Sequence, residues 1–438
     1  MNRRILRLAV PSIVSNITVP LLGLVDVSIV GHLGETAYIG AIAVGGLLFN
    51  ILYWNFGFLR MGTSGLTSQA YGRKDQAAEM KTLVQAVCTG LFFALVILLL
   101  QYPVRRMAFY LLETSAEVER YAVAYFRVCV WGAPAVLVMY GFKGWFIGMQ
   151  NSRFPMYIAI SVNVVNILCS LCFVFGFGMK VEGVALGTVV AEWSGLILAI
   201  VLWLRRYGYL RARIAFRDSL QLAAIRHFFA VNRDIFLRTL CLIAVTAFFT
   251  SSGARQGDVI LAVNTLLMQL FTLFSYIMDG FAYAAEALTG RYIGACNLRQ
   301  LKHAVRNLFG WGIVLSLLFT VMYAAGGKNF LGLLTNDTGV VETAGDYFYW
   351  VLAVPLAGFG AFLWDGILIG ATATRQMLLA IIVAAGVFFG IYFAGSGATD
   401  NHILWLAFLV YLFLRGLMMT VWGRQIFSET YLKKIAGN

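Results

Sequence analysis

The sequence reads Gly-Trp-Phe-Ile-Gly at residues 144–148 and Gly-Ile-Leu-Ile-Gly at residues 366–370, and an arginine follows five positions after each pair. Both glycines and the arginine are displaced by the same 222 positions. The same offset aligns Leu-Thr at 66–67 and Gly72 with Leu-Thr at 288–289 and Gly294, while Pro134 and Pro355 match to within one residue. The chain is therefore predicted to contain two repeated halves.

The composition indicates that these halves lie in lipid. Hydrophobic residues make up 61% of the 438 residues and charged residues only 12%, whereas a soluble domain carries about 25% charged residues. The apolar runs are continuous rather than alternating, which predicts membrane-spanning helices. A window of about 19 residues gives twelve spans, at 9–32, 38–64, 82–101, 119–147, 155–177, 183–204, 228–251, 258–288, 304–325, 344–370, 376–395 and 402–424.

The predicted fold is an all-α polytopic membrane protein with two six-helix, pseudo-symmetric lobes. The lobes are predicted at 1–204 (helices 1–6) and 228–438 (helices 7–12), joined by a basic linker loop at 205–227. A shift of six spans keeps both halves in the same orientation, as in transporters with parallel repeats. The apolar stretch after Arg3 lacks a cleavage site and carries Asp26, so we expect it to be a retained first helix.

The net charge of +13 does not indicate nucleic-acid binding, because the basic residues lie in the short gaps between apolar runs. With both termini inside, the inner loops hold more than three times as many Lys and Arg as the outer loops. The sequence shows no phosphate-binding loop, no nucleophile elbow and no metal-ligand spacing. We therefore expect no catalytic residues, no metal and no cofactor apart from a coupling ion.

Asp26 is the main candidate for ion coupling, because an ionisable residue inside the hydrocarbon is costly and usually functional. It lies six residues after Pro20, which removes a backbone donor and lets the helix bend. Asn163, Asn166 and Ser170 share one face of the fifth span. The alternative for these residues is a permanent hydrogen-bonded network that packs helices together.

Two further spans carry polar faces that could line a substrate cavity or a second coupling site. Thr188 and Glu192 lie four residues apart on the sixth span. The eighth span carries a stripe with alternating steps of four and three: Thr265, Gln269, Thr272, Tyr276, Asp279, Tyr283 and Glu286. Acids and tyrosines together suit organic cations, and a structural network is again the alternative. No role is assigned to Arg60, Arg127, Arg238, Asp346, Asp365 or Arg415.

The chain resembles the multidrug and toxic compound extrusion (MATE) transporters, and specifically their DinF branch. The resemblance rests on these segments: 15–26 (Ser-Asn-Ile-Thr-Val-Pro-Leu-Leu-Gly-Leu-Val-Asp), 29–32, 65–67, 190–192, 232–234, 262–264, 279–284 and 365–371. It implies two six-helix lobes around a central cavity and export of cationic, amphipathic or lipophilic compounds in exchange for protons or sodium. Asp26 stands where the family has its coupling aspartate, and Ser170 stands where many members have a second aspartate.

Together, the residues and the resemblance predict a proton-coupled multidrug antiporter, a monomer with both termini cytoplasmic in a bacterial inner membrane. Its partners would be the lipid bilayer and small cationic or lipophilic solutes, and sodium stays open as the coupling ion. A flippase for lipid-linked precursors is the first alternative, although such a protein would be expected to have a basic cavity. An integral membrane enzyme and a channel are the others.

Overall fold

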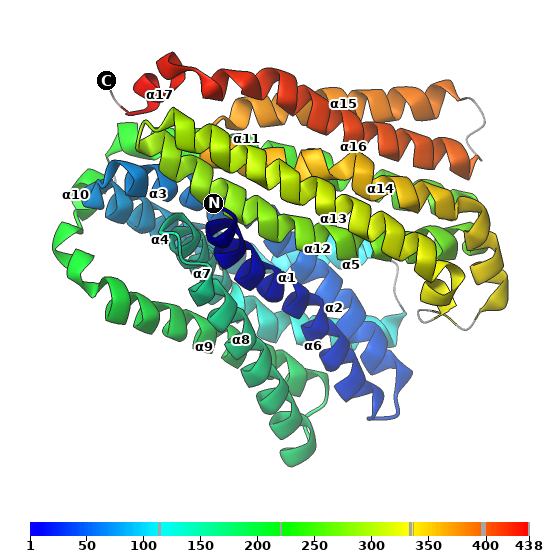
Figure 1. Cartoon of the computed structure of the whole chain (residues 1–438). Coiled ribbons are helices and arrows are strands. Elements are labelled where there is room, and N and C mark those ends of the chain that lie inside the picture. The colour runs from blue at the N-terminus through cyan, green and yellow to red at the C-terminus, as the bar shows by residue number, and fades with distance from the viewer. Residues whose placement is uncertain (113–114, 220, 333–334, 336, 396–399, 437–438) are drawn as a thin grey trace. The chain divides into compact units, whose positions relative to one another are not determined.

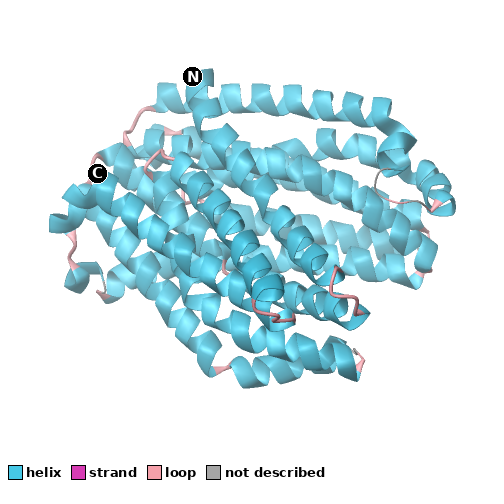
Figure 2. Cartoon of the chain, turned by 90° about the horizontal axis from the view of Figure 1, so that it is seen from below, coloured by secondary structure: helices cyan, strands magenta, loops and turns pink. Residues whose placement is uncertain are grey.

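The computed structural model describes residues 1–438 except 113–114, 220, 333–334, 336, 396–399 and 437–438. Every regular element in the described part is helical, as Figure 2 shows. Twelve helical segments of this part are long and apolar enough to cross a membrane, and each overlaps one of the predicted spans. The prediction of a twelve-span helical membrane protein is therefore confirmed, although most of the helices extend beyond the predicted boundaries.

The described chain divides into two compact units. The first, here called the N-unit, covers Val14–Asn232 and holds most of α1 (Asn2–Gly31), then α2 (Thr36–Asn55), α3 (Gly57–Arg73), α4 (Gln76–Leu99), α5 (Gln101–Leu112), α6 (Ala116–Cys129), α7 (Ala133–Gly148), α8 (Arg153–Leu171), α9 (Val181–Tyr207), α10 (Phe216–Ser219) and the start of α11 (Leu222–Arg255). Figure 1 labels these helices.

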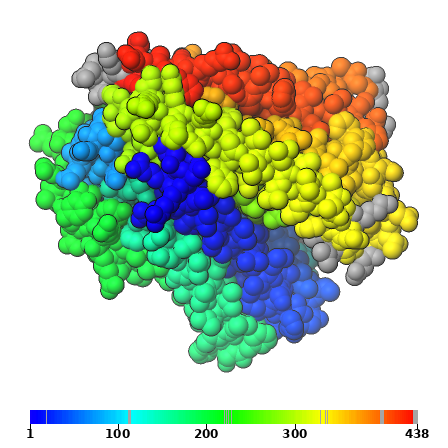
Figure 3. All heavy atoms as spheres, in the orientation of Figure 1, coloured from blue at the N-terminus to red at the C-terminus, as the bar shows by residue number. Residues whose placement is uncertain are grey.

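The second, here called the C-unit, joins Met1–Ile13 to Arg233–Asn438. It holds the rest of α11 and then α12 (Asp258–Gly294), α13 (Leu298–Gly332), α14 (Thr338–Gly370), α15 (Thr374–Ala394), α16 (Asn401–Gly423) and α17 (Glu429–Ala436). The first residues of α1 lie against α12 and α13 (Figure 3): Arg4 donates a hydrogen bond to the Tyr292 hydroxyl over 3.1 Å, and Asn2 borders a cavity with Arg306.

Helix packing repeats at the offset seen in the sequence. Gly144 of α7 lies against the carbonyl of Arg60, and Gly366 of α14 lies against the carbonyl of Ala282, again 222 positions on. In both places a β-carbon would collide with backbone atoms of the facing helix. The recurring glycines are therefore explained by close backbone approach, the usual use of small residues between membrane helices.

Backbone turns repeat as well. The four residues other than glycine with positive φ in the described chain form two such pairs: Lys74 (60°) with Cys296 (51°), and Gln150 (61°) with Thr372 (54°). Each ends a helix in the left-handed conformation that usually selects glycine. The two halves thus share local geometry even where their side chains differ.

Some elements depart from the expected pattern. The segment predicted as a linker loop at 205–227 carries a 3₁₀ turn at Gly208–Arg213, helix α10, and the start of α11 at Leu222. Helix α5, a short helix with Pro103 in its first turn, is not predicted from the sequence. In the fourth span a 3₁₀ turn at Val130–Gly132 precedes Pro134, whereas Pro355 lies inside the unbroken α14. The lobe boundaries given from the sequence stay predictions.

Candidate functional site

Asp26 lies on α1 of the N-unit and is buried, with 4% of its surface exposed. Its Oδ1 atom has no hydrogen-bond partner among the described residues. Tyr125 and Cys129 of α6 lie within electrostatic range of the carboxylate. In a membrane helix the ionised form of a buried carboxylate with an unpaired oxygen is energetically costly. Protonation or binding of a cation lowers that cost.

The asparagines of α8 are hydrogen-bonded to the neighbouring helices. Asn163 donates to the Thr18 carbonyl of α1 over 2.7 Å, two residues before Pro20. Asn166 donates to the Thr188 hydroxyl of α9 over 3.0 Å, and that hydroxyl donates to the Val184 carbonyl over 3.1 Å. Asn163 therefore links α8 to the part of α1 where Pro20 predicts a bend. In the structure, α1 runs unbroken through Pro20.

Ser170 is fully buried, and its Oγ lacks a partner among the described residues, as does Oδ1 of Asn166. Gly187 of α9 packs directly on Ser170, because a β-carbon there would stand 2.8 Å from the Ser170 backbone nitrogen. Asp26, Asn166 and Ser170 thus each carry a buried oxygen atom that no described donor satisfies.

The C-unit shows what occupies the corresponding positions in the other half. Counting 222 residues on from Asp26, Asn166 and Ser170 leads to Phe248, Phe388 and Tyr392. The Phe248 ring centroid lies 5.9 Å from that of Phe388 and 5.0 Å from that of Tyr392. The three equivalent positions therefore meet in the C-unit.

Glu192 belongs to a second group of charges in the N-unit. Its carboxylate lies against Gly132, and Lys143 of α7 is its charged neighbour. Tyr53 lies within electrostatic range of Glu192 and Cys129, and Tyr125 within range of both Glu192 and Asp26. Sequence reasoning missed Lys143, Tyr125 and Cys129. A lysine inside an apolar span was a usable signal, whereas a tyrosine and a cysteine in such a span were not.

The polar stripe of α12 lies in the C-unit and changes its exposure along the helix. Thr265 and Gln269 are exposed, the middle residues are half-buried, and Glu286 has 1% of its surface exposed. Thr265 and Thr272 donate hydrogen bonds to carbonyls one turn earlier, at Leu261 and Met268. Asp279 and Tyr276 are electrostatic neighbours, while Tyr283 is half-buried. The stripe is thus one helix face that becomes progressively more buried toward Glu286.

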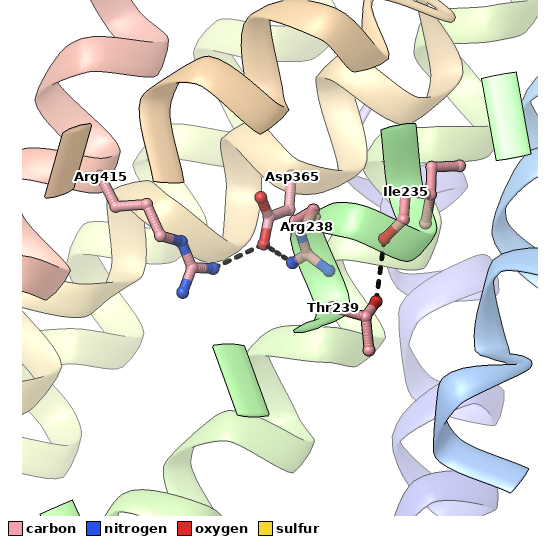
Figure 4. A network of polar contacts seen from close by, with 5 residues as sticks. All are labelled: Ile235, Arg238, Thr239, Asp365 and Arg415. Atoms are coloured by element: carbon pink, nitrogen blue, oxygen red, sulfur yellow. Dashed lines mark hydrogen bonds and ion pairs between the residues drawn. The ribbon is translucent and has the colours of Figure 1, made fainter. Parts of the chain in front are cut away.

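The C-unit also contains a buried ion cluster, shown in Figure 4. Arg238 of α11 and Arg415 of α16 both donate to Oδ2 of Asp365 on α14, and the Arg415 contact measures 2.6 Å. These three residues have no role predicted from the sequence, because the spacing of distant helices cannot show which charges meet. In the part of the chain described, no group of three or more His, Cys, Asp or Glu residues is arranged to hold a metal ion.

Comparison with known proteins agrees with this architecture. The MatE family model matches residues 11–172 and 235–394. The DNA damage-inducible protein F of Escherichia coli is 38% identical over 436 residues, which cover 98% of this chain and 94% of that protein. The multidrug export protein MepA of Staphylococcus saprophyticus is 20% identical, covering 89% and 86%.

Solved structures show the same fold. A eukaryotic MATE transporter, AtDTX14, superposes with a TM-score of 0.85 at 16% identity, covering 100% of this chain and 98% of that one. A MATE transporter in its bent conformation gives 0.85 at 18% identity, covering 100% and 97%. The resemblance stated from the sequence is confirmed: the chain belongs to the MATE family, whose members are polytopic membrane transporters and not enzymes.

Proposed function

We propose that this protein is a proton-coupled multidrug efflux antiporter that exports cationic, amphipathic or lipophilic compounds by alternating access. The observation that carries the proposal is the buried Asp26 carboxylate, with Oδ1 unpaired among the described residues and Pro20 six residues before it on the same helix. The S. saprophyticus relative, whose name refers to multidrug export, supports a role in efflux.

In the proposed cycle, proton binding changes the free energy of α1. An ionised Asp26 inside the hydrocarbon costs several kcal/mol unless it is paired, and protonation removes that charge. A neutral Asp26 can donate a hydrogen bond, and the unpaired oxygens of Asn166 and Ser170 are suitable acceptors. Because Asn163 holds the Thr18 carbonyl, such a rearrangement would act on α1 near Pro20. Proton and solute would then favour opposite conformations.

The N-unit is proposed as the coupling unit, and the α12 stripe of the C-unit as a wall for the solute. Asp279, Glu286 and two tyrosines give that face negative charge and aromatic surface, which suits organic cations. The excess of Lys and Arg in the predicted inner loops supports a bacterial inner-membrane protein with both termini cytoplasmic. The protein is proposed to act as a monomer.

The test is transport by purified protein in proteoliposomes with a fluorescent cationic dye, under a proton gradient alone and a sodium gradient alone. We expect the proton gradient to drive dye transport, Asp26→Asn to abolish it, and Asp346→Asn, which alters an exposed carboxylate, to leave it unchanged. Full antiport by a folded Asp26→Asn protein would refute the proposal. Transport driven by the sodium gradient alone would support the proposed antiport, with sodium in place of the proton as the coupling ion.

The first alternative is a flippase for lipid-linked precursors. Such a protein needs basic side chains to hold phosphate, and the α12 stripe carries two acids and no basic residue. Dye transport in the assay above would exclude a dedicated flippase, whereas translocation of a labelled lipid-linked precursor without dye transport would establish one.

A further inference from the structure

The ion cluster of Arg238, Asp365 and Arg415 ties together three helices of the C-unit that are far apart in sequence. Arg238 comes from α11, Asp365 from α14 and Arg415 from α16, and their exposed fractions are 6%, 6% and 4%. Figure 4 shows both guanidinium groups directed at the same carboxylate. These residues belong to neither the coupling group around Asp26 nor the α12 stripe.

The cluster carries one more positive than negative charge. Asp365 neutralises one arginine, and the second arginine remains uncompensated within the cluster. The other acid nearby on α11 is Asp234, one turn before Arg238. Its Oδ1 accepts from Arg233 over 3.0 Å and its Oδ2 from Thr374 over 3.2 Å, and both of these partners lie outside the cluster. An uncompensated buried charge is strongly unfavourable in a protein interior.

The geometry of the ion pairs leaves hydrogen-bonding capacity on the arginines. An arginine fully engaged by a carboxylate forms two parallel hydrogen bonds with it. Here both arginines instead use their Nη2 atoms on one oxygen, Oδ2 of Asp365. The Nε atoms of Arg238 and Arg415 are buried and have no acceptor among the described residues. Arg415 also has the Tyr411 side chain as a hydrogen-bond partner, and Oδ1 of Asp365 has none among the described residues. The two Nε donors are therefore the ones that a second anionic group would satisfy.

The surroundings also fit an anion. The side chains keep 5–9% of their surface exposed, so the cluster is not completely sealed. The guanidinium carbon of Arg415 lies 5.9 Å from the ring centroids of both Phe362 and Tyr411. Aromatic walls exclude water and strengthen the attraction of a guanidinium for an anion, because the local dielectric constant is low.

We propose that the Arg238–Asp365–Arg415 cluster is an anion-binding site of the C-unit, which takes a small monovalent anion such as chloride or the carboxylate of a solute. The anion compensates the second arginine and accepts hydrogen bonds from donors that Asp365 leaves unused. A cation is disfavoured at this place by the two guanidinium groups. The proposal rests on the contacts of the cluster and is independent of the proposed transport activity.

The experiment measures the Tm of the purified full-length protein while chloride replaces isethionate, a bulky anion without a carboxylate, at constant ionic strength and constant sodium. We expect a saturable rise of Tm with chloride, because a ligand that binds the folded state stabilises it by mass action. A parallel titration with acetate separates the two sources. A saturable response to chloride alone assigns the site to inorganic anions, and a response to acetate as well assigns it to carboxylates.

Variants of the cluster give effects of opposite sign. Arg415→Met and Arg238→Met each leave a neutral pair, so the apparent chloride affinity should fall about tenfold or more, as expected for loss of a charged hydrogen bond. Asp365→Asn leaves two arginines unopposed and should raise that affinity. Arg233→Met removes an exposed arginine of the same helix and should change nothing.

Direct binding of radiolabelled chloride, measured by equilibrium dialysis, keeps the proposal testable if a variant fails to fold. Wild-type protein should bind chloride in a single saturable class that bromide displaces. The proposal is overturned if wild-type protein shows saturable binding of neither chloride nor acetate, or if a folded Arg415→Met or Arg238→Met protein binds the anion as the wild type does.

Discussion

Asn166 donates a hydrogen bond to Thr188 across 3.0 Å, which joins α8 to α9 beside the proposed coupling group. The amide uses its NH₂ group in this contact, and its Oδ1 is left without a described partner. The hydrogen bond therefore holds the amide in the orientation that presents an acceptor to a protonated carboxyl or a cation.

Thr188→Val tests this arrangement, because it keeps the shape of the side chain and removes the hydroxyl. We expect a loss of about 1–2 kcal/mol of stability, since the buried Asn166 amide loses its acceptor. We also expect a weaker response of dye transport to the proton gradient. The loss of stability is measured as a lower Tm, and the weaker transport response is measured in proteoliposomes. Thr246→Val, which removes a hydroxyl bonded within its own helix, is the control. Equal transport in the two variants would mean that Asn166 is held by other contacts.

Gly366→Ala and Gly144→Ala test the close helix contacts that recur in both halves. In each case the added methyl group collides with the backbone of the facing helix, at Ala282 or Arg60. We expect each substitution to cost about 1–3 kcal/mol, as for overpacking in a core, and to lower the Tm. Gly390→Ala is the control, because no atom lies within 4 Å of its added carbon. It should be neutral or stabilising, since glycine weakens a helix.

Those glycines also show what the sequence could reveal about the fold. The twelve spans and the repeat were predictable, because lipid demands long apolar helices and because close packing leaves glycines at a fixed offset. Helix α5 was not, since its mixed composition resembles that of a loop. The turn at Lys74 recurs at Cys296 with no similarity of side chain, so the duplication extends further in the backbone than in the residues.

The candidate sites were predictable only where one helix carried the signal. Asp26, Asn163 and Asn166 stood out as polar residues in apolar runs. The meeting of Arg238, Asp365 and Arg415 depends on three helices whose contacting residues lie 127 and 50 positions apart, and no spacing rule reports such contacts. Lys143 and Glu192 likewise come from different helices, α7 and α9.

Tyr431 gives a prediction about pH at the end of the chain, outside the membrane-spanning helices. Its hydroxyl donates to the Ala371 carbonyl over 2.9 Å, and burial raises the pKa of Tyr431 from 10.0 to about 12. The folded state favours the neutral phenol, so the contribution of Tyr431 to stability is complete below pH 10 and is lost as the pH rises toward 12.

The comparison is between wild-type protein and Tyr431→Phe, with Tm measured from pH 8 to pH 11. Wild-type protein should be the more stable below pH 10, because the variant lacks the hydrogen bond to Ala371. Its advantage should shrink as the pH rises, since phenylalanine does not titrate. Parallel curves over the whole range would show that Tyr431 does not titrate with the fold.

Lys143 and Glu192 provide the last test, a double-mutant cycle within the N-unit. Each is the charged neighbour of the other in an apolar surrounding, so Lys143→Met leaves the carboxylate without its counter-charge and Glu192→Gln leaves the ammonium without its own. We expect each single substitution to lower stability. The double substitution should be milder than the sum of the two by about 0.5–3 kcal/mol, which is the range of coupling for contacting residues. Stability is measured as Tm and by denaturant unfolding in detergent, with transport assayed in parallel. Additive effects would show that the two charges are screened from one another, and Glu192 would then remain available to the proposed solute or proton pathway.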